Sequence, residues 1–314
     1  MDPAYSVILF TSSSGAGYGL LTGLALARLA GTWDANPWLW VAGCIVALAL
    51  VTVGLLSSTF HLGHPERAWR ATSQWRSSWL SREGVLAILA YPAALLFTAG
   101  WLWSPLAGGV LDVAAAVTAV LSLATVYSTG MIYASLKTIP RWNHPLVPYV
   151  YLALAMASGG LLFAVLISLS GAASPPALLL LLAVLLLAWA LKDIYWRVVD
   201  RRKPRSDTGT ATGLGHLGEI RQLESPHTSE NYLLQEMGFQ VARKHAAKLR
   251  RYARVLGMLL PALALLFALR VGGVEQTVLL AAALLLGLAG IVVERWLFFA
   301  EARHLVTLYY GRSL

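Results

Sequence analysis

The chain has 314 residues, of which 58% are hydrophobic and only 12% are charged, about half the charged share of a typical globular protein. A soluble fold of this length cannot bury so much apolar surface, because polar groups must still cover its exterior, so most of the chain is expected to lie in lipid. The net charge is +9, and in a membrane protein the location of such charges indicates orientation.

Eight stretches of the sequence are long and apolar enough to cross a bilayer, which requires roughly 20 mainly apolar residues. Turn residues separate them, for example Pro105 and the Gly272–Gly273 pair. The sequence therefore predicts an all-α integral membrane protein, a single membrane domain built as a bundle of eight transmembrane helices. We place the spans at about residues 6–29, 37–60, 83–103, 109–134, 147–170, 175–196, 254–271 and 275–298.

The first stretch contains Gly15, Gly19 and Gly23, which recur at every fourth position. Small residues at this spacing let a neighbouring helix approach closely, so they favour helix packing over a ligand cleft. No basic segment precedes this stretch, and we expect the first span to serve as its own anchor. The single cysteine, Cys44, excludes a disulfide framework or a cysteine-ligated metal cluster within the chain.

The basic residues lie almost entirely on one side of the predicted bundle. Of the 24 Lys and Arg residues, all but Arg28 and Arg270 fall in or beside segments on the same side as both termini. Because cytoplasmic loops carry the excess of basic residues, both termini and the connections 61–82, 135–146 and 197–253 are expected in the cytoplasm. The last of these connections is too short for a large soluble domain, and we expect it to contact a partner subunit.

Charged side chains avoid the centres of six predicted spans, which argues against a proton relay or an ion-coupled transporter. The adjacent opposite charges Lys192–Asp193 and Glu294–Arg295 lie near cytoplasmic span ends, where we expect simple interfacial anchors. All seven histidines lie at span ends or in the connections, so two facing ligands for a buried haem are missing. A haem at the cytoplasmic edge, held by His61 or His64, stays open as an alternative.

The connection between the second and third spans holds the densest group of functional residues. His61 ends the second span and Glu83 begins the third, so the two could face one another across one pocket. A quinone that enters sideways from the bilayer needs hydrogen-bond donors and groups that exchange protons, which a histidine beside a carboxylate provides. The alternative is an aromatic belt with interfacial arginines. The candidate quinone-binding residues are His61, Glu83, Arg67, Trp75, Arg76 and Ser78.

A second interface group follows the fourth span. It contains Lys137, Arg141, Trp142 and Asn143, and it lies on the same predicted side as His64. These residues would either close the pocket as a secondary part of it or dock a partner subunit.

Four segments carry recognisable motifs: PAYSVILFT at residues 3–11, HLGHPERA at 61–68, WLSRE at 79–83 and SPHTSENY at 225–232. Together they resemble the membrane-anchor subunit of dimethyl sulfoxide reductase-type molybdoenzyme complexes, the DmsC family. The resemblance implies a quinone-reactive subunit with no haem or metal of its own, located in the bacterial inner membrane. It also implies two partners, an iron–sulfur subunit and a molybdopterin catalytic subunit, and it identifies His61 and Glu83 as the residues that serve quinol binding.

The motif at residues 225–232 adds His227 and Tyr232 as candidates for the secondary pocket or the partner contact. The long connection that contains it most resembles the branch whose catalytic subunit faces the cytoplasm and oxidises sulfite, with ubiquinone or menaquinone as electron acceptor. The chain itself would not touch the oxyanion substrate. The first alternative is the anchor of a dimethyl sulfoxide or N-oxide reductase that oxidises menaquinol. More distant alternatives are a haem-bearing cytochrome anchor, a transporter and a passive scaffold.

Overall fold

The computed structural model of the protein describes residues 3–32, 36–60, 62–103, 108–202, 206–221, 223–224 and 241–310. Within these ranges all regular structure is helical. Eight of the described helical segments are long and apolar enough to cross a membrane, which confirms the predicted all-α bundle. They are α1 (Tyr5–Ala30), α2 (Pro37–Thr59), α3 (Trp79–Ala99), α4 (Gly109–Ala134), α5 (Leu146–Leu169), α6 (Pro175–Arg201), the consecutive α9 (Val241–Arg254), η4 (Val255–Leu259) and α10 (Leu260–Ala268), and α11 (Gly273–Ala300).

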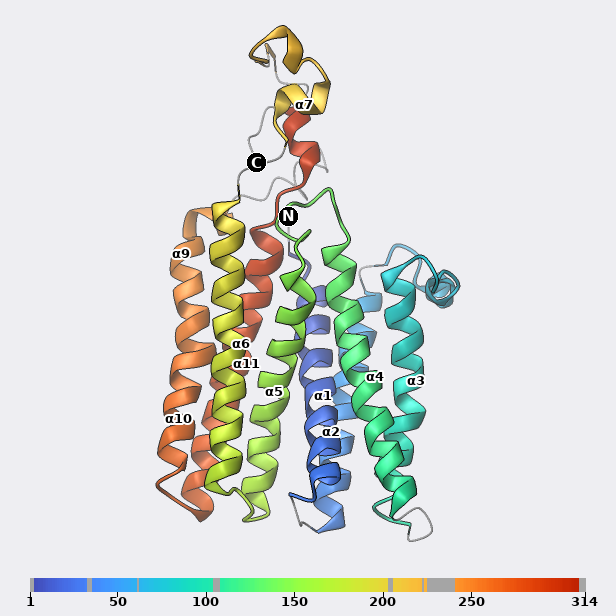
Figure 1. Ribbon diagram of the computed structural model, residues 1–314, viewed down its shortest axis with the longest axis vertical. Coiled ribbons are helices and arrows are strands. Elements are labelled where there is room, and N and C mark those ends of the chain that lie inside the picture. The colour runs from blue at the N-terminus through green and yellow to red at the C-terminus, as the bar shows by residue number, and fades with distance from the viewer. Residues whose placement is uncertain are drawn as a thin grey trace.

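The long helices lie side by side in one bundle, and the longer connections gather at one of its ends (Figure 1). Helix α1 begins and helix α11 ends at this end. Four short helices also lie there: η1 (Pro65–Thr72), α7 (Thr208–Thr212), η3 (Gly215–Leu217) and η5 (Leu305–Tyr310). We call it the loop end, and it comprises the described residues 62–78, 135–145, 206–221, 223–224 and 301–310.

Helix α1 lies inside the bundle, where it contacts α2, α4, α5 and α11. Its most apolar part is 72% buried, whereas that of α6 is only 28% buried. The outer surface of α6 exposes leucines such as Leu180 and Leu187. Lipid tails are as apolar as leucine, so this surface is compatible with a bilayer.

The glycine spacing of α1 is explained by one close crossing with α5. A methyl group at Gly19 would overlap the main-chain carbonyl of Ala155, and one at Gly159 would overlap the backbone of Gly19. Gly15 and Gly23 have more room, because a methyl group at either would lie 3.8 Å from its nearest neighbour. The packing role expected from the sequence is confirmed, and it depends on the contact between Gly19 and Gly159.

Two helices begin earlier than the apolar stretches predict. Helix α3 begins at Trp79 because Ser78 caps it: the Ser78 Oγ accepts a hydrogen bond from the Ser81 amide at 3.4 Å. Helix α9 begins at Val241, and its first turns are so rich in Lys and Arg that hydropathy alone excludes them. The π-helical η4 joins it to α10 just before Pro261, which has no amide hydrogen to continue the helical ladder.

Candidate functional site

The connection between α2 and α3 lies on the surface of the loop end. Helix η1 contains no buried residue, and Arg67, Trp75 and Arg76 are all exposed. The Nδ1 atom of His64 lies 3.0 Å from Oε1 of Glu66, and an exposed pair of this kind contributes little stability. Three of the predicted site residues fall outside the described residues: His61, His227 and Tyr232.

The first turn of α3 holds this connection in place. Arg82 donates from Nε to the Trp75 carbonyl at 3.0 Å and from Nη2 to the Arg76 carbonyl at 2.7 Å. The hydroxyl of Ser81 donates to the carbonyl of Ala71 at the end of η1. Trp75 and Arg76 are therefore fixed through their main chain, and their exposed side chains contact each other, with the Arg76 guanidinium 5.5 Å over the Trp75 ring.

Glu83 differs from the other described candidates because it is inside the bundle. It lies just after the first turn of α3, and only 5% of its surface is exposed. The hydroxyl of Thr129 in α4 donates a hydrogen bond to its Oε1 atom. A carboxyl group inside a membrane protein is costly and typically marks a functional position. Among the described candidates, Glu83 is therefore the strongest one for proton exchange.

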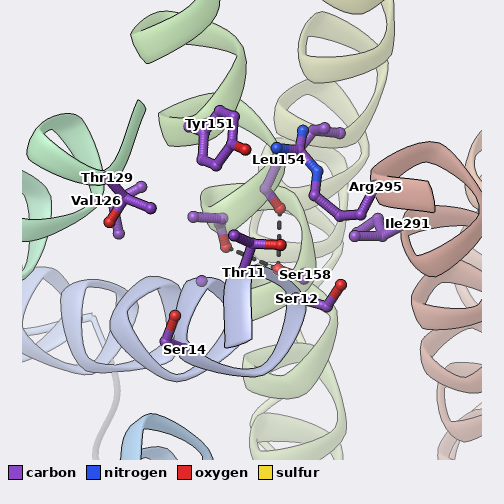
Figure 2. A pocket seen from close by; sticks show the side chains of 12 residues that line it. Thr11, Ser12, Ser14, Val126, Thr129, Tyr151, Leu154, Ser158, Ile291 and Arg295 are labelled. Atoms are coloured by element: carbon purple, nitrogen blue, oxygen red, sulfur yellow. Dashed lines mark hydrogen bonds between the residues drawn. The ribbon is translucent and has the colours of Figure 1, made fainter. Parts of the chain in front are cut away.

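A small cavity lies next to Thr129, between helices of the bundle (Figure 2). Helices α1, α4, α5 and α11 line it, and its polar wall includes Ser12, Ser158 and Arg295. The cavity has room for a water-sized molecule and is too small for a quinone ring. A quinone that reacts at Glu83 must therefore approach from a different side of the carboxyl group.

Three charged side chains form a buried cluster that joins α6 and α11. Lys192 and Glu294 have no exposed surface, and Arg295 has 2%. Glu294 pairs with Lys192 and accepts a hydrogen bond from the Arg295 Nε at 2.5 Å. The expected interfacial anchoring is wrong for these three residues, because their side chains point into the bundle. Asp193 does stay partly exposed, with its Oδ1 atom 3.7 Å from Nε of Arg254.

Most of the second predicted group is engaged within the chain. Trp142 is buried, and its Nε1 donates to the Phe298 carbonyl in α11 at 2.9 Å. Asn143 donates to the Ala134 carbonyl at the end of α4 at 2.6 Å. Lys137 is exposed. Trp142 and Asn143 thus hold the connection before α5 against its neighbouring helices, and Lys137 is the member that a partner can reach.

Arg141 belongs to a network of charges at the loop end. Its Nη2 atom lies 2.6 Å from an oxygen of Asp200 and 3.0 Å from one of Glu301. Arg250 reaches the same two acids, each at 2.5 Å. The network ties α6, α9 and the end of α11 to the connection before α5.

Sequence reasoning missed the polar residues around the cavity. Serine and threonine are common inside transmembrane helices, where the hydroxyl bonds to a carbonyl of the preceding turn, as Ser158 does to Leu154 at 2.9 Å. Neither Ser158 nor Thr129 carries a pattern that separates it from such packing residues. The sequence feature that could have indicated a polar site in the bundle was the pair Glu294–Arg295, two charges within the predicted last span.

Two loop-end histidines are expected to make the stability of the protein sensitive to acid. The Nδ1 atom of His144 accepts a hydrogen bond from the Leu146 amide at 3.2 Å, and that of His304 accepts one from the Val306 amide at 3.0 Å. Burial lowers the pKa of both histidines, and the charge of Arg202 lowers that of His144 further. The folded protein therefore binds protons less readily than the unfolded chain, whose histidine pKa is about 6.5.

Stability from these histidines is accordingly present above about pH 6.5 and is lost as the pH falls through the lower folded-state values. Asparagine can accept the same amide hydrogen bond but does not titrate. The melting temperature in detergent is measured at about pH 7 and pH 5. We expect it to fall less between these values for the double variant His144→Asn, His304→Asn than for the wild type. The same loss in both proteins would show that these histidines do not cause the acid sensitivity.

Comparison with known proteins gives the relatives of this protein. The C subunit of the sulfite dehydrogenase of Allochromatium vinosum is 33% identical over 327 residues, which cover 99% of both sequences. The corresponding C component of the polysulfide reductase of Wolinella succinogenes is 28% identical over 50% of this sequence and 57% of its own length. That of the anaerobic dimethyl sulfoxide reductase of Escherichia coli is 30% identical over 47% of this sequence and 52% of its own length. No solved structure gives a significant match.

The first of these relatives is matched from end to end, whereas the matched region spans only slightly more than half the length of the other two. The family described as DMSO reductase anchor subunit (DmsC) matches residues 1–311, nearly the whole sequence. The eight long apolar helices agree with a membrane anchor. The protein therefore belongs to the DMSO reductase anchor subunit (DmsC) family, as its sequence motifs indicate.

Proposed function

We propose that this protein is the quinone-reactive membrane anchor of a molybdopterin oxidoreductase complex. It passes electrons between a partner iron–sulfur subunit and the quinone pool, while a second partner carries out the substrate chemistry at molybdopterin. The observation that carries the proposal is the buried Glu83 carboxyl near the loop end of a protein from an anchor-subunit family. A buried carboxyl at this depth can exchange a proton with a ring that lies at the edge of the bilayer.

The quinone, as substrate, would bind between Glu83 and the connection from α2 to α3. It cannot occupy the cavity next to Thr129, which is too small for its ring. Arg67 and Arg76 are exposed and offer guanidinium donors, and the exposed Trp75 and the half-buried Ser78 complete the candidate set. The family resemblance adds His61 as the partner of Glu83 in proton exchange.

The best candidate for the reaction of the complex is the oxidation of sulfite coupled to the reduction of a quinone. The full-length match to the C subunit of a sulfite dehydrogenase favours it over the reduction of dimethyl sulfoxide, because the dimethyl sulfoxide reductase relative matches only half of the sequence. Oxidation of sulfite to sulfate releases two electrons and two protons, and reduction of a quinone to a quinol consumes the same number.

The partner subunits would cover the loop end, and the excess of basic residues assigns this end to the cytoplasm. The loop end exposes apolar side chains away from the membrane helices: Leu217 is 71% exposed and Leu223 is 98% exposed. Apolar side chains held out in this way are typical of a surface that a partner covers. Lys137 is also exposed there and is available to an acidic partner.

Purification of the protein with its partners from the native membrane tests this function. We expect the complex to contain molybdenum and iron, and to reduce a quinone in liposomes when sulfite is added. The optical spectrum of the isolated anchor should lack a haem Soret band. Reduction of dimethyl sulfoxide by menaquinol, with no sulfite oxidation, would instead identify the alternative reductase. Purification without metal-containing partners would contradict the proposal as a whole.

A further inference from the structure

Arg295 carries donor groups that the described part of the protein leaves unsatisfied. Its Nε donates to Glu294 at 2.5 Å and its guanidinium lies 4.0 Å over the ring of Tyr151, but neither Nη1 nor Nη2 has a hydrogen-bond partner among the described residues. The side chain is 2% exposed, so bulk water does not reach these nitrogens. Arg295 lines the cavity from α11, and Thr129 lines it from α4 (Figure 2). Leaving buried charged donors unpaired is costly, so an occupant of the cavity is expected.

The buried cluster around Arg295 also contains more positive than negative charges. Lys192 and Arg295 are positive and share the single carboxylate of Glu294, which leaves one excess positive charge in the cluster. Glu301 is already shared by two arginines at the loop end. Glu83 is the other buried acid of the described membrane helices, and it is joined to the cavity through the Thr129 hydroxyl. Arg295 therefore lines the cavity with a positive charge, and the complementary charge of Glu83 lies behind Thr129, which lines it from α4.

The chemistry of the cavity wall favours water over an anion. The hydroxyls of Thr11, Ser14 and Ser158 donate to main-chain carbonyls within their own helices, at 2.9, 2.6 and 2.9 Å. Their oxygens are thereby left as acceptors toward the cavity, while Arg295 supplies donors. The hydroxyls of Ser12 and Tyr151 also line the cavity, have no partner among the described residues, and can donate or accept. Water satisfies donors and acceptors together, whereas an anion would face the three acceptor oxygens as well. The available space is sufficient for a buried water with two to four polar partners.

We propose that this cavity is a water-binding site that links the Arg295 guanidinium, through Thr129, to the carboxyl group of Glu83. Arg295 acts there as a positioning residue: its charge and the bridging water hold the Glu83 carboxyl in the geometry needed for proton exchange. The inference rests on the proposed function, since it assigns a role to residues behind the quinone site. It requires no contact between Arg295 and the quinone.

The site itself can be tested without any assay of activity. A cryo-electron microscopy map of the whole complex, at a resolution that shows ordered water, is expected to contain density within hydrogen-bond distance of an Arg295 Nη atom and of the Thr129 hydroxyl. A cavity that is empty, or closed by side chains, would overturn the proposal. In the Thr129→Val variant the same density should weaken, because valine fills the same space but offers no hydrogen bond.

Kinetics test the positioning role. We expect Thr129→Val and Arg295→Met each to lower kcat for quinone-coupled turnover about tenfold, the effect of losing one hydrogen bond to a charged group, with KM for the quinone unchanged. Arg295→Met leaves Lys192 and Glu294 as a balanced pair, and Arg295→Lys should restore part of the rate. Thr118→Val is the matched control: Thr118 is fully buried in the same helix but does not line the cavity.

The outcomes distinguish a failure of the water link from a failure of the proposed quinone site. If Thr129→Val and Arg295→Met both behave like Thr118→Val while Glu83→Gln is inactive with quinone, the water link is wrong and the quinone site stands. If Glu83→Gln is also fully active with quinone, the proposed function of the site is itself wrong. Should Arg295→Met fail to assemble, the map decides: density beside Arg295 must be present in the wild-type complex and weaken in Thr129→Val, because the kinetics of Thr129→Val also include the loss of its direct hydrogen bond to Glu83.

Discussion

Replacement of Glu83 by glutamine is expected to lower quinone-coupled turnover of the complex at least about 100-fold, the usual effect of removing a group that transfers a proton in the reaction. Glutamine has the shape of glutamate and its carbonyl oxygen can still accept the hydrogen bond of Thr129. The helices should therefore pack as before, and the loss should fall on proton exchange alone. Sulfite oxidation with an artificial dye acceptor should keep its rate, because the dye takes electrons from the partner subunits.

The matched control is Glu66→Gln. Glu66 lies in η1 on the same connection, but its side chain is 62% exposed and its described partners, His64 and Arg67, are exposed as well. We expect this variant to retain both activities. Normal quinone kinetics in Glu83→Gln would remove the carboxyl group from the mechanism. A parallel loss of quinone and dye activity would indicate damage to assembly of the complex instead.

The long helices were predictable because their signal is the composition of continuous stretches. A bilayer requires an apolar segment of roughly fixed length. Such a segment is recognised from its average composition, so misjudging a few residues does not change the number of predicted spans. The helix ends were less predictable. The start of α3 depends on the cap that Ser78 provides, and the start of α9 lies in a basic segment, so neither contributes to hydropathy.

The identity of Glu83 as a candidate was available from the sequence, since a carboxyl group at the start of an apolar span is unusual and falls in a family motif. Its burial was not available, because it depends on the face that α3 turns toward Thr129. The same limit explains the error at Lys192, Glu294 and Arg295. Position along a helix can be counted, whereas the direction of a side chain around the helix follows only from packing.

Replacement of Glu294 by glutamine is expected to destabilise the protein by about 3–5 kcal/mol, the typical cost of removing one partner from a buried ion pair. Glu294 has no exposed surface and is the single carboxylate between Lys192 and Arg295. Without it, two positive side chains remain inside the bundle with no counter-charge beside them. Thermal unfolding in detergent, followed by tryptophan fluorescence, should show a lower melting temperature, and less protein should accumulate in the membrane.

Two further variants show whether charge balance is the cause. Glu275→Gln is a control in the same helix, because Glu275 is exposed in the first turn of α11. Lys192→Met should destabilise less than Glu294→Gln, since it leaves Glu294 and Arg295 as a balanced pair at 2.5 Å. If Glu294→Gln melted at the same temperature as Glu275→Gln, the cluster would not need its carboxylate. Equal losses in Glu294→Gln and Lys192→Met would indicate that packing, rather than net charge, governs the cluster.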